Sequence, residues 1–173
     1  MDKMRRVASI KLEGERMEKR KSSHDAPFNF WSGVLFGLGL VAFIDEAVFH
    51  QLLHWHHFYD KSTTNIGLIS DGLFHAFSWF ATVVSLFMLA DLWRRKVWNG
   101  KRWIGAAFLG AGVFQLYDGL IQHKLMRLHQ IRYVEDVFYY DVVWNVLAGC
   151  MIIIGLVLVL LKKAPKKGKE GEA

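Results

Sequence analysis

Four long apolar windows constrain the fold of this chain more than any other feature of its sequence. They cover about residues 28–54, 73–93, 103–125 and 142–161. A helix needs about 20 mostly apolar residues to cross the roughly 30 Å of hydrocarbon in a bilayer, and each window is long enough. Residues 146–161 are apolar on every face, unlike an amphipathic helix of a soluble bundle. The sequence therefore predicts an all-α integral membrane four-helix bundle.

Basic residues lie where such a topology would place them. They gather before the first window, between the second and third, and after the fourth, whereas the other two connections hold few. The positive-inside rule then predicts a multi-pass protein of the cell membrane with both termini cytoplasmic. The net charge of +6 follows from this distribution, so we expect the lipid bilayer as partner and no nucleic acid. Contacts with other membrane proteins or a second copy stay open.

The windows also predict the domain organisation. Residues 1–27 form a basic cytoplasmic tail, for which disorder is favoured, residues 28–161 form the membrane domain, and residues 162–173 form a second basic tail. The first tail has no apolar stretch of the kind that a secretory signal carries. A single cysteine, Cys150, excludes a disulfide framework or a cage of thiolates.

A pattern of glycine, aspartate and histidine occurs twice. The first copy reads Gly37-x-Gly39-x5-Asp45-x4-His50-x-Leu52-x3-His56, and the second reads Gly110-x-Gly112-x5-Asp118-x4-His123-x-Leu125-x3-His129. The first and third windows run in the same direction, so the pattern predicts two tandem parallel helix-hairpin repeats, at residues 28–93 and 103–161, related by an axis along the membrane normal. We expect the glycines to let helices pack closely.

Carboxylates and imidazoles are costly inside a bilayer, so their presence there indicates a functional site. Histidine with carboxylate and without thiolate suits zinc, iron or copper(II). We expect His50, His75 and His123 as direct metal ligands, and the aspartates as ligands or as groups that orient the histidines. The full set of candidate metal-site residues is Asp45, Glu46, His50, His56, His57, Asp71, His75, Asp118, His123, His129 and Asp141.

Helix geometry limits how these residues combine. At about 100° per residue, Asp45 and His50 point roughly 140° apart on an ideal helix, so either a π-bulge brings them together or they play different roles at the site. A helix that continued past the window would carry His54 and His57 on the same face as Glu46 and His50. Asp71 and His75 are spaced to chelate one ion.

The two copies are not identical, and part of the first lies near the membrane surface. Gly119 and Arg127 stand where the first copy has Glu46 and His54, so a shared site would be only pseudo-symmetric. Aromatic residues beside the consecutive histidines mark the interface with water, where amphipathic side chains are tolerated. The histidines there are therefore either ligands or interfacial residues: His54, His56 and His57.

Three other interpretations of the polar residues stay open. They could form a structural hydrogen-bond network in a non-catalytic accessory or assembly protein. A b-type haem between His50 and His123 is disfavoured by the aspartates, because haem pockets in membranes are mostly apolar. A conduit for protons or metal ions is disfavoured because residues 107–116 and 152–161 carry no ionisable group.

Several motifs in order resemble a family of small bacterial and archaeal predicted membrane proteins, catalogued as a domain of unknown function, number twenty-two forty-three. They are Asp45-x4-His50-Gln51-Leu52-Leu53-x-Trp55-His56-His57, Asp71-Gly72-Leu73-Phe74-His75-Ala76-Phe77 and Asp118-Gly119-x3-His123-x-Leu125-x3-His129-Gln130. The resemblance covers about residues 28–161 and implies a four-span fold but no activity. It also associates the chain with respiratory-oxidase copper-assembly factors, which would favour copper. Asp118 stands where the family has Glu, which shortens the reach of that carboxylate.

The sequence thus predicts an integral membrane metal-binding protein with an outward-facing His/carboxylate site for one or two ions. Its use would be redox chemistry or metal handling in the cell envelope. Whether it is an enzyme, such as a metal-dependent oxidoreductase or hydrolase, stays open, as does the substrate. An apolar cavity beside His50 that opens toward lipid would favour an enzyme, whereas ligands open to water would favour metal delivery.

Overall fold

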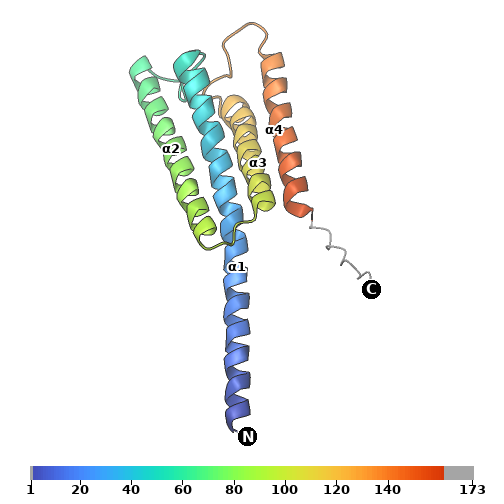
Figure 1. Ribbon diagram of the computed structural model, residues 1–173. Coiled ribbons are helices and arrows are strands. Elements are labelled where there is room, and N and C mark those ends of the chain that lie inside the picture. Colours follow the sequence, from blue (N-terminus) through green and yellow to red (C-terminus); the bar gives the residue numbers. More distant parts are fainter. Residues whose placement is uncertain (1, 162–173) are drawn as a thin grey trace.

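A computed structural model describes residues 2–161, and every regular element in that part of the chain is helical. The elements are α1 (Asp2–Asp45), the π-helix η1 (Glu46–Leu52), α2 (Thr64–Arg94), α3 (Gly100–Tyr117), the π-helix η2 (Asp118–Leu125) and α4 (Phe138–Leu160). The four α-helices stand side by side, with α1 and α3 in the middle (Figure 1). Helix α2 packs on α1 and α4 packs on α3, and among the described residues the backbone of neither outer helix packs on the central helix beyond.

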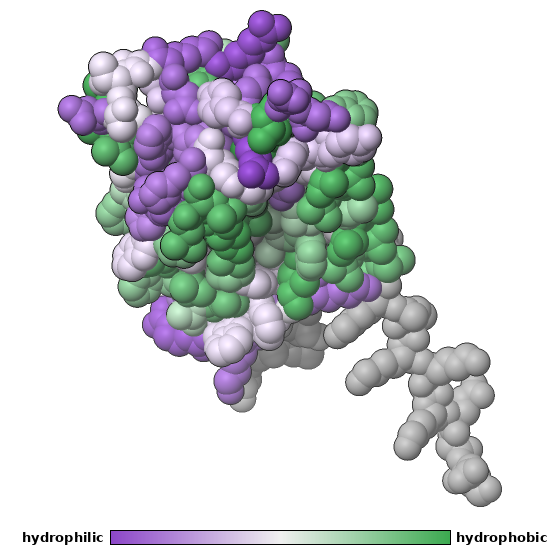
Figure 2. Space-filling view, turned by 90° about the horizontal axis from the view of Figure 1, so that it is seen from above, coloured by the Kyte–Doolittle hydropathy of each residue, from purple (hydrophilic) through white to green (hydrophobic). Residues whose placement is uncertain are grey.

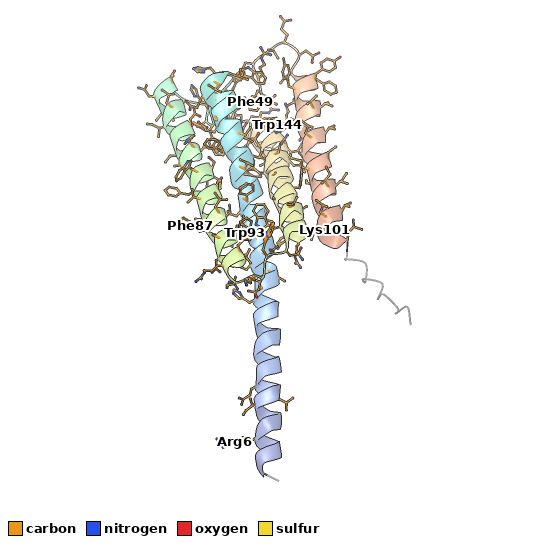
Figure 3. The ribbon with its side chains drawn as sticks, viewed as in Figure 1. Arg6, Phe49, Phe87, Trp93, Lys101 and Trp144 are labelled. Atoms are coloured by element: carbon orange, nitrogen blue, oxygen red, sulfur yellow. The ribbon has the colours of Figure 1, made fainter. Side chains whose placement is uncertain are left out.

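The predicted four spans are confirmed. Four stretches are long and apolar enough to cross a membrane: Ser23–Leu52, Thr64–Arg94, Gly100–Leu125 and Phe138–Leu160. Many of their large apolar side chains are exposed, including Phe87, which is labelled on the outer side of α2 in Figure 3. In Figure 2 hydrophilic residues gather over the upper part of the view, and hydrophobic residues lie below them and on the right. Exposed apolar side chains along the spans suit a surface that contacts lipid.

Helix boundaries differ from the sequence-based expectation at the N-terminal side. Helix α1 begins at Asp2 and includes Pro27, so residues 2–27 are helical where disorder was favoured. In Figure 1 this part of α1 extends beyond the other helices. Many side chains in this first stretch are lysine, arginine and glutamate, which have high helix propensity, and this explains the difference. The predicted tail at residues 162–173 lies outside the described residues.

The two central helices cross where glycines remove side chains. A Cβ atom on Gly37 would overlap the carbonyl group of Ala107, and one on Gly110 would overlap the carbonyl group of Val34. Backbone therefore lies against backbone, as small residues permit in membrane helices. The expected packing role of these glycines is confirmed.

Polar side chains join α1, α2 and α3 at the end of the bundle opposite His50 and His123. Asn29 of α1 donates a hydrogen bond to the Asn99 carbonyl and accepts one from the Asn99 backbone N–H. The Ser32 hydroxyl donates to the Ser85 carbonyl of α2 and accepts a hydrogen bond from the indole of Trp103 on α3. These bonds satisfy polar groups that are costly to bury in lipid, and they hold the lower half of the bundle in register.

Alanine substitutions at these glycines test the crossing. We expect Gly37→Ala and Gly110→Ala to destabilise the protein by about 1–3 kcal/mol, because the added methyl groups push α1 and α3 apart. Gly72→Ala and Gly149→Ala are matched controls, since an added Cβ there meets nothing within 4 Å. Thermal unfolding in detergent should show lower midpoints for the first pair only. Equal midpoints for both pairs would contradict this crossing.

Candidate metal centre

Both central helices change to π-helical geometry beside an aspartate. In η1 the Leu53 N–H donates to the Val48 carbonyl, and in η2 the Met126 N–H donates to the Ile121 carbonyl, each five residues back. This wider turn brings side chains five residues apart onto one face. The His123 Nε2 atom consequently lies 3.0 Å from Asp118 Oδ2.

The same change occurs in the first half, although the pair there is looser. The His50 Nε2 atom lies 3.9 Å from Asp45 Oδ2. Of the two arrangements that the sequence left open for this pair, the π-bulge is the one present. Each bulge also lies within a helix that the sequence correctly placed in the membrane.

The chain turns sharply after each π-helix and then returns toward the bundle. His54 and Arg127 occupy equivalent places in these turns, and each has a φ of 51°, a left-handed conformation that is uncommon outside glycine. Because η1 ends at Leu52, the expectation that His54 and His57 continue the helical face of Glu46 and His50 is wrong. The turn leaves His54 exposed and carries His56 into the interior.

Four histidines from the two halves meet in the interior. His50, His56, His123 and His129 are each at most 5% exposed. The rings of His56 and His129 stack with centroids 4.5 Å apart and an interplanar angle of 4°. His50 contacts the edge of this pair on one side, at 4.5 Å from His56, and His123 contacts it on the other, at 4.7 Å from His129. The two π-helices thus supply the outer rings and the two connecting segments supply the stacked pair.

The stacked histidines are held by an exchange of hydrogen bonds between the connecting segments. His56 Nδ1 lies 3.0 Å from the Ile131 carbonyl oxygen, and His129 Nδ1 lies 2.9 Å from the Phe58 carbonyl oxygen. A carbonyl oxygen only accepts, so each Nδ1 carries the hydrogen and each Nε2 keeps its lone pair. Both Nε2 atoms are buried and have no hydrogen-bond partner among the described residues. Metal-binding histidines are typically oriented in this way.

Electrostatics keep His56 neutral. Burial lowers the pKa of His56 from its ordinary 6.5 to about 2, and the neighbouring His129, His50 and His123 lower it further, against a smaller opposing effect of Asp118. A metal ion binds the neutral imidazole, so the site holds this ring in the form that binding requires.

Carboxylates surround the outer histidine of the first half. His50 Nδ1 lies 2.7 Å from Glu46 Oε2 and 3.2 Å from Asp71 Oδ1. Although the Glu46 contact is short, neither of its two atoms forms a hydrogen bond of acceptable geometry. This nitrogen and this oxygen lie close together without forming a hydrogen bond, an arrangement that suits two ligands of the same metal ion. The other oxygen of Asp71 lies 2.6 Å from Nδ1 of His57, whose side chain is 29% exposed.

Three groups of ligand atoms in the described part of the chain are compact enough to hold a metal ion, each with its atoms within 4.8 Å of one another and with all its residues buried. They share His50 and His56, so the groups form one continuous centre. The groups are His56, His123 and His129; Asp45, His50 and His56; and Glu46, His50 and Asp71.

Four predicted site residues belong to none of these groups: His57, His75, Asp118 and Asp141. His75, expected as a direct ligand, packs its ring against Phe43 with centroids 5.3 Å apart, while Asp71 faces His50 and His57 instead of forming the expected pair with His75. Asp141 forms an ion pair of 2.5 Å with Lys124. Asp118 borders the centre beside His123 and His129, and His57 borders it beside Asp71. The other predicted residues lie within the groups.

The sequence did not predict that His56 and His129 stack, nor which carbonyl groups accept their hydrogen bonds. His56 was treated as a ligand or an interfacial residue, because aromatic residues beside it suggested the membrane surface. One sequence signal distinguishes it: His56 recurs as His129, 73 positions later, whereas the equivalents of His54 and His57 are Arg127 and Gln130. No side-chain pattern could identify the carbonyl acceptors, because they are backbone atoms.

The family model described as "Predicted membrane protein (DUF2243)" matches residues 32–162, which include the whole centre, most of the first span and all of the other three. The chain belongs to this family. The resemblance seen in the sequence is therefore confirmed for this predicted membrane protein. The comparisons with curated proteins and with solved structures gave no significant match.

The lowered pKa of His56 predicts acid sensitivity of the metal-free protein. The unfolded chain binds a proton at His56 near pH 6.5, whereas the folded chain does so only near 2. Stability from this group is therefore fully present above pH 6.5 and is lost as the pH falls from there. His56→Asn removes the titrating ring, while its amide can still donate to Ile131.

Thermal unfolding of chelator-treated protein in detergent measures this effect. Between about pH 7 and pH 5, we expect the midpoint of His56→Asn to fall less than that of the unsubstituted protein. An identical fall in both proteins would show that His56 does not contribute.

Proposed function

We propose that this protein is an integral membrane metal-binding protein whose His/carboxylate centre serves redox chemistry in the cell envelope. One observation carries the proposal. Ligand nitrogens of His56, His123 and His129 lie within 4.8 Å of one another in a buried place, and the Nε2 atoms of the stacked pair have no hydrogen-bond partner among the described residues. A bound cation would accept these lone pairs.

The rival interpretation, a structural hydrogen-bond network, agrees less well with these contacts. A stable buried network needs every member satisfied. Within residues 2–161, His56 Nε2 and His123 Nδ1 are buried with neither a hydrogen bond nor an ion pair to a carboxylate, and each such group costs about 1–3 kcal/mol when left unpaired. A bound metal ion would remove this cost, because it would bind these nitrogens. A structural hydrogen-bond network would leave them without a partner.

The donor atoms suit zinc, iron or copper(II), because they are imidazole nitrogens and carboxylate oxygens. Cys150 is exposed on α4 and belongs to none of the three groups. One ion would bind the three histidines of the first group, and a second would bind Glu46, His50 and Asp71. A haem between His50 and His123 is disfavoured, since both rings contact the stacked imidazoles that lie between them.

Topology supports an outward-facing centre built from two tandem repeats. The connection from α2 to α3 lies at the end opposite the histidines (Figure 3, near Trp93 and Lys101) and carries five basic residues within positions 94–102, which favours the cytoplasm for that end and for both termini. The repeat is supported by matched geometry, since both π-helices, both left-handed turns and both histidine-to-carbonyl bonds recur 73 residues apart.

Burial favours chemistry over delivery of metal. The four central histidines are at most 5% exposed, so an ion held by them would not be open to water on the outer face. An apolar groove borders the centre from the side, which was the feature expected of an enzyme that acts on a hydrophobic molecule. The metal would supply Lewis acidity or electron transfer, and the carboxylates would orient the histidines.

Elemental analysis of the detergent-purified chain tests the proposal. We expect at least one transition-metal ion per chain, and its loss in His56→Ala, His123→Ala and His129→Ala, because each variant removes a ligand from the three-histidine group. His54→Ala and His75→Ala are matched controls that should keep the metal, since neither residue belongs to the centre.

Size-exclusion chromatography and circular dichroism identify variants that fail to fold. Folded protein that binds no metal after incubation with zinc, iron or copper would refute the proposal and favour the structural network. A Soret band in the absorption spectrum would instead indicate haem.

A further inference from the structure

Two apolar grooves open on the sides of the molecule between helices whose backbones do not pack directly on each other. The larger, of about 590 Å³, lies between α2 and α3 and includes Leu38 of α1. The smaller, of about 410 Å³, is lined by α3, α4, η1 and the connecting segments. Both volumes are typical of small-molecule sites. Both grooves lie along membrane-spanning stretches, so a ligand would enter from the lipid.

The wall of the larger groove is also the wall of the metal centre. Phe58 and Phe74 line the groove, and their rings stack with centroids 4.7 Å apart. Phe74 lies 5.8 Å from the ring of His50, and Phe58 lies 6.2 Å from the ring of His129. A molecule in the groove would therefore be separated from the central histidines by a single aromatic layer.

One buried polar side chain lines this groove without a side-chain hydrogen bond. Gln122 is 3% exposed, and its amide makes no side-chain hydrogen bond within the described residues. Of the other polar lining residues, Tyr117 is 49% exposed, and Ser70 is already paired, since its hydroxyl donates to the Gly67 carbonyl and accepts from the Tyr59 N–H. A ligand that carries a carbonyl or hydroxyl group would hydrogen-bond to the Gln122 amide.

The lining also indicates the rest of the ligand. The rings of Phe58, Phe74 and Phe114 follow one another nearly in parallel, with interplanar angles of 25° and 16°, and flat rings pack well on such a surface. No charged residue of the described chain lines the groove, which disfavours the charged headgroup of a phospholipid or fatty acid.

We propose that the groove between α2 and α3 binds the headgroup of an isoprenoid quinone. Such a molecule is lipid-soluble, flat and uncharged, and its oxygens can accept a hydrogen bond from the Gln122 amide or, as quinol hydroxyls, donate one to it. This inference rests on the proposed metal centre for its redox partner. Binding of the quinone can be measured separately.

The smaller groove provides an internal control, because it occupies the equivalent place in the second half without the same chemistry. Leu73 of the larger groove corresponds to Val143 of the smaller, and Gln122 corresponds to Phe49. The amide of Gln115, which lines the smaller groove, already donates to the Trp144 carbonyl. The smaller groove therefore offers a ligand no unpaired amide.

Isothermal titration of the detergent-purified chain with decylubiquinone tests the proposal, with 1-decanol as a ligand that lacks the ring. We expect saturable binding of decylubiquinone only. Leu73→Trp should abolish it by filling the groove, and Gln122→Leu should weaken it about tenfold by removing one hydrogen bond. Val143→Trp, the matched control in the smaller groove, should bind as the unsubstituted protein does.

Three results would overturn the proposal: no binding of decylubiquinone to folded protein, equal binding of 1-decanol, or a loss of binding in Val143→Trp but not in Leu73→Trp. Metal content is measured on the same samples. Protein that binds the quinone but holds no metal would refute the proposed function alone, and protein that holds metal but binds no quinone would refute this inference alone.

Discussion

The arrangement of the centre depends on the two hydrogen bonds that the connecting segments exchange. Each stacked histidine donates from Nδ1 to a carbonyl of the opposite segment, His56 to Ile131 and His129 to Phe58. These bonds set the tautomer of both rings, direct both Nε2 atoms inward, and tie the two halves together above α1 and α3. The same segments supply Phe58 and Ile131 as lining of the lateral grooves.

The halves agree in backbone and differ in chemistry. In the first half, Glu46 and Asp71 face His50. In the second half, Gly119 replaces the glutamate, and a Cβ there would press on Asn145 and Trp144. The equivalent aspartate, Asp141, is paired with Lys124. Carboxylates are therefore concentrated on one side of a nearly symmetric set of histidines, so the two proposed ion sites would differ in their ligands.

Much of this structure could be predicted because membrane helices obey strong constraints on length and polarity. The four spans and the close glycine crossing followed from apolar length and small residues. The convergence of Asp118 with His123 did not follow from helix periodicity, which sets residues five apart roughly 140° apart, and the π-bulge that brings them together was one of two arrangements left open. The inward turn of His56 and the packing of His75 against Phe43 could not be predicted, because the first depends on where η1 ends and the second on local ring packing. The extension of α1 to Asp2 was also missed, since charge density was weighed above helix propensity.

X-ray absorption spectroscopy of the metal-loaded protein tests most directly the claim that histidines from both halves bind one ion. The account predicts a first shell of nitrogen and oxygen atoms, at about 2.0–2.1 Å if the metal is zinc, with the outer-shell scattering of at least three imidazoles. His129→Ala should reduce the imidazole contribution by one ring. A shell of oxygen atoms alone, or one unchanged in His129→Ala, would contradict the account.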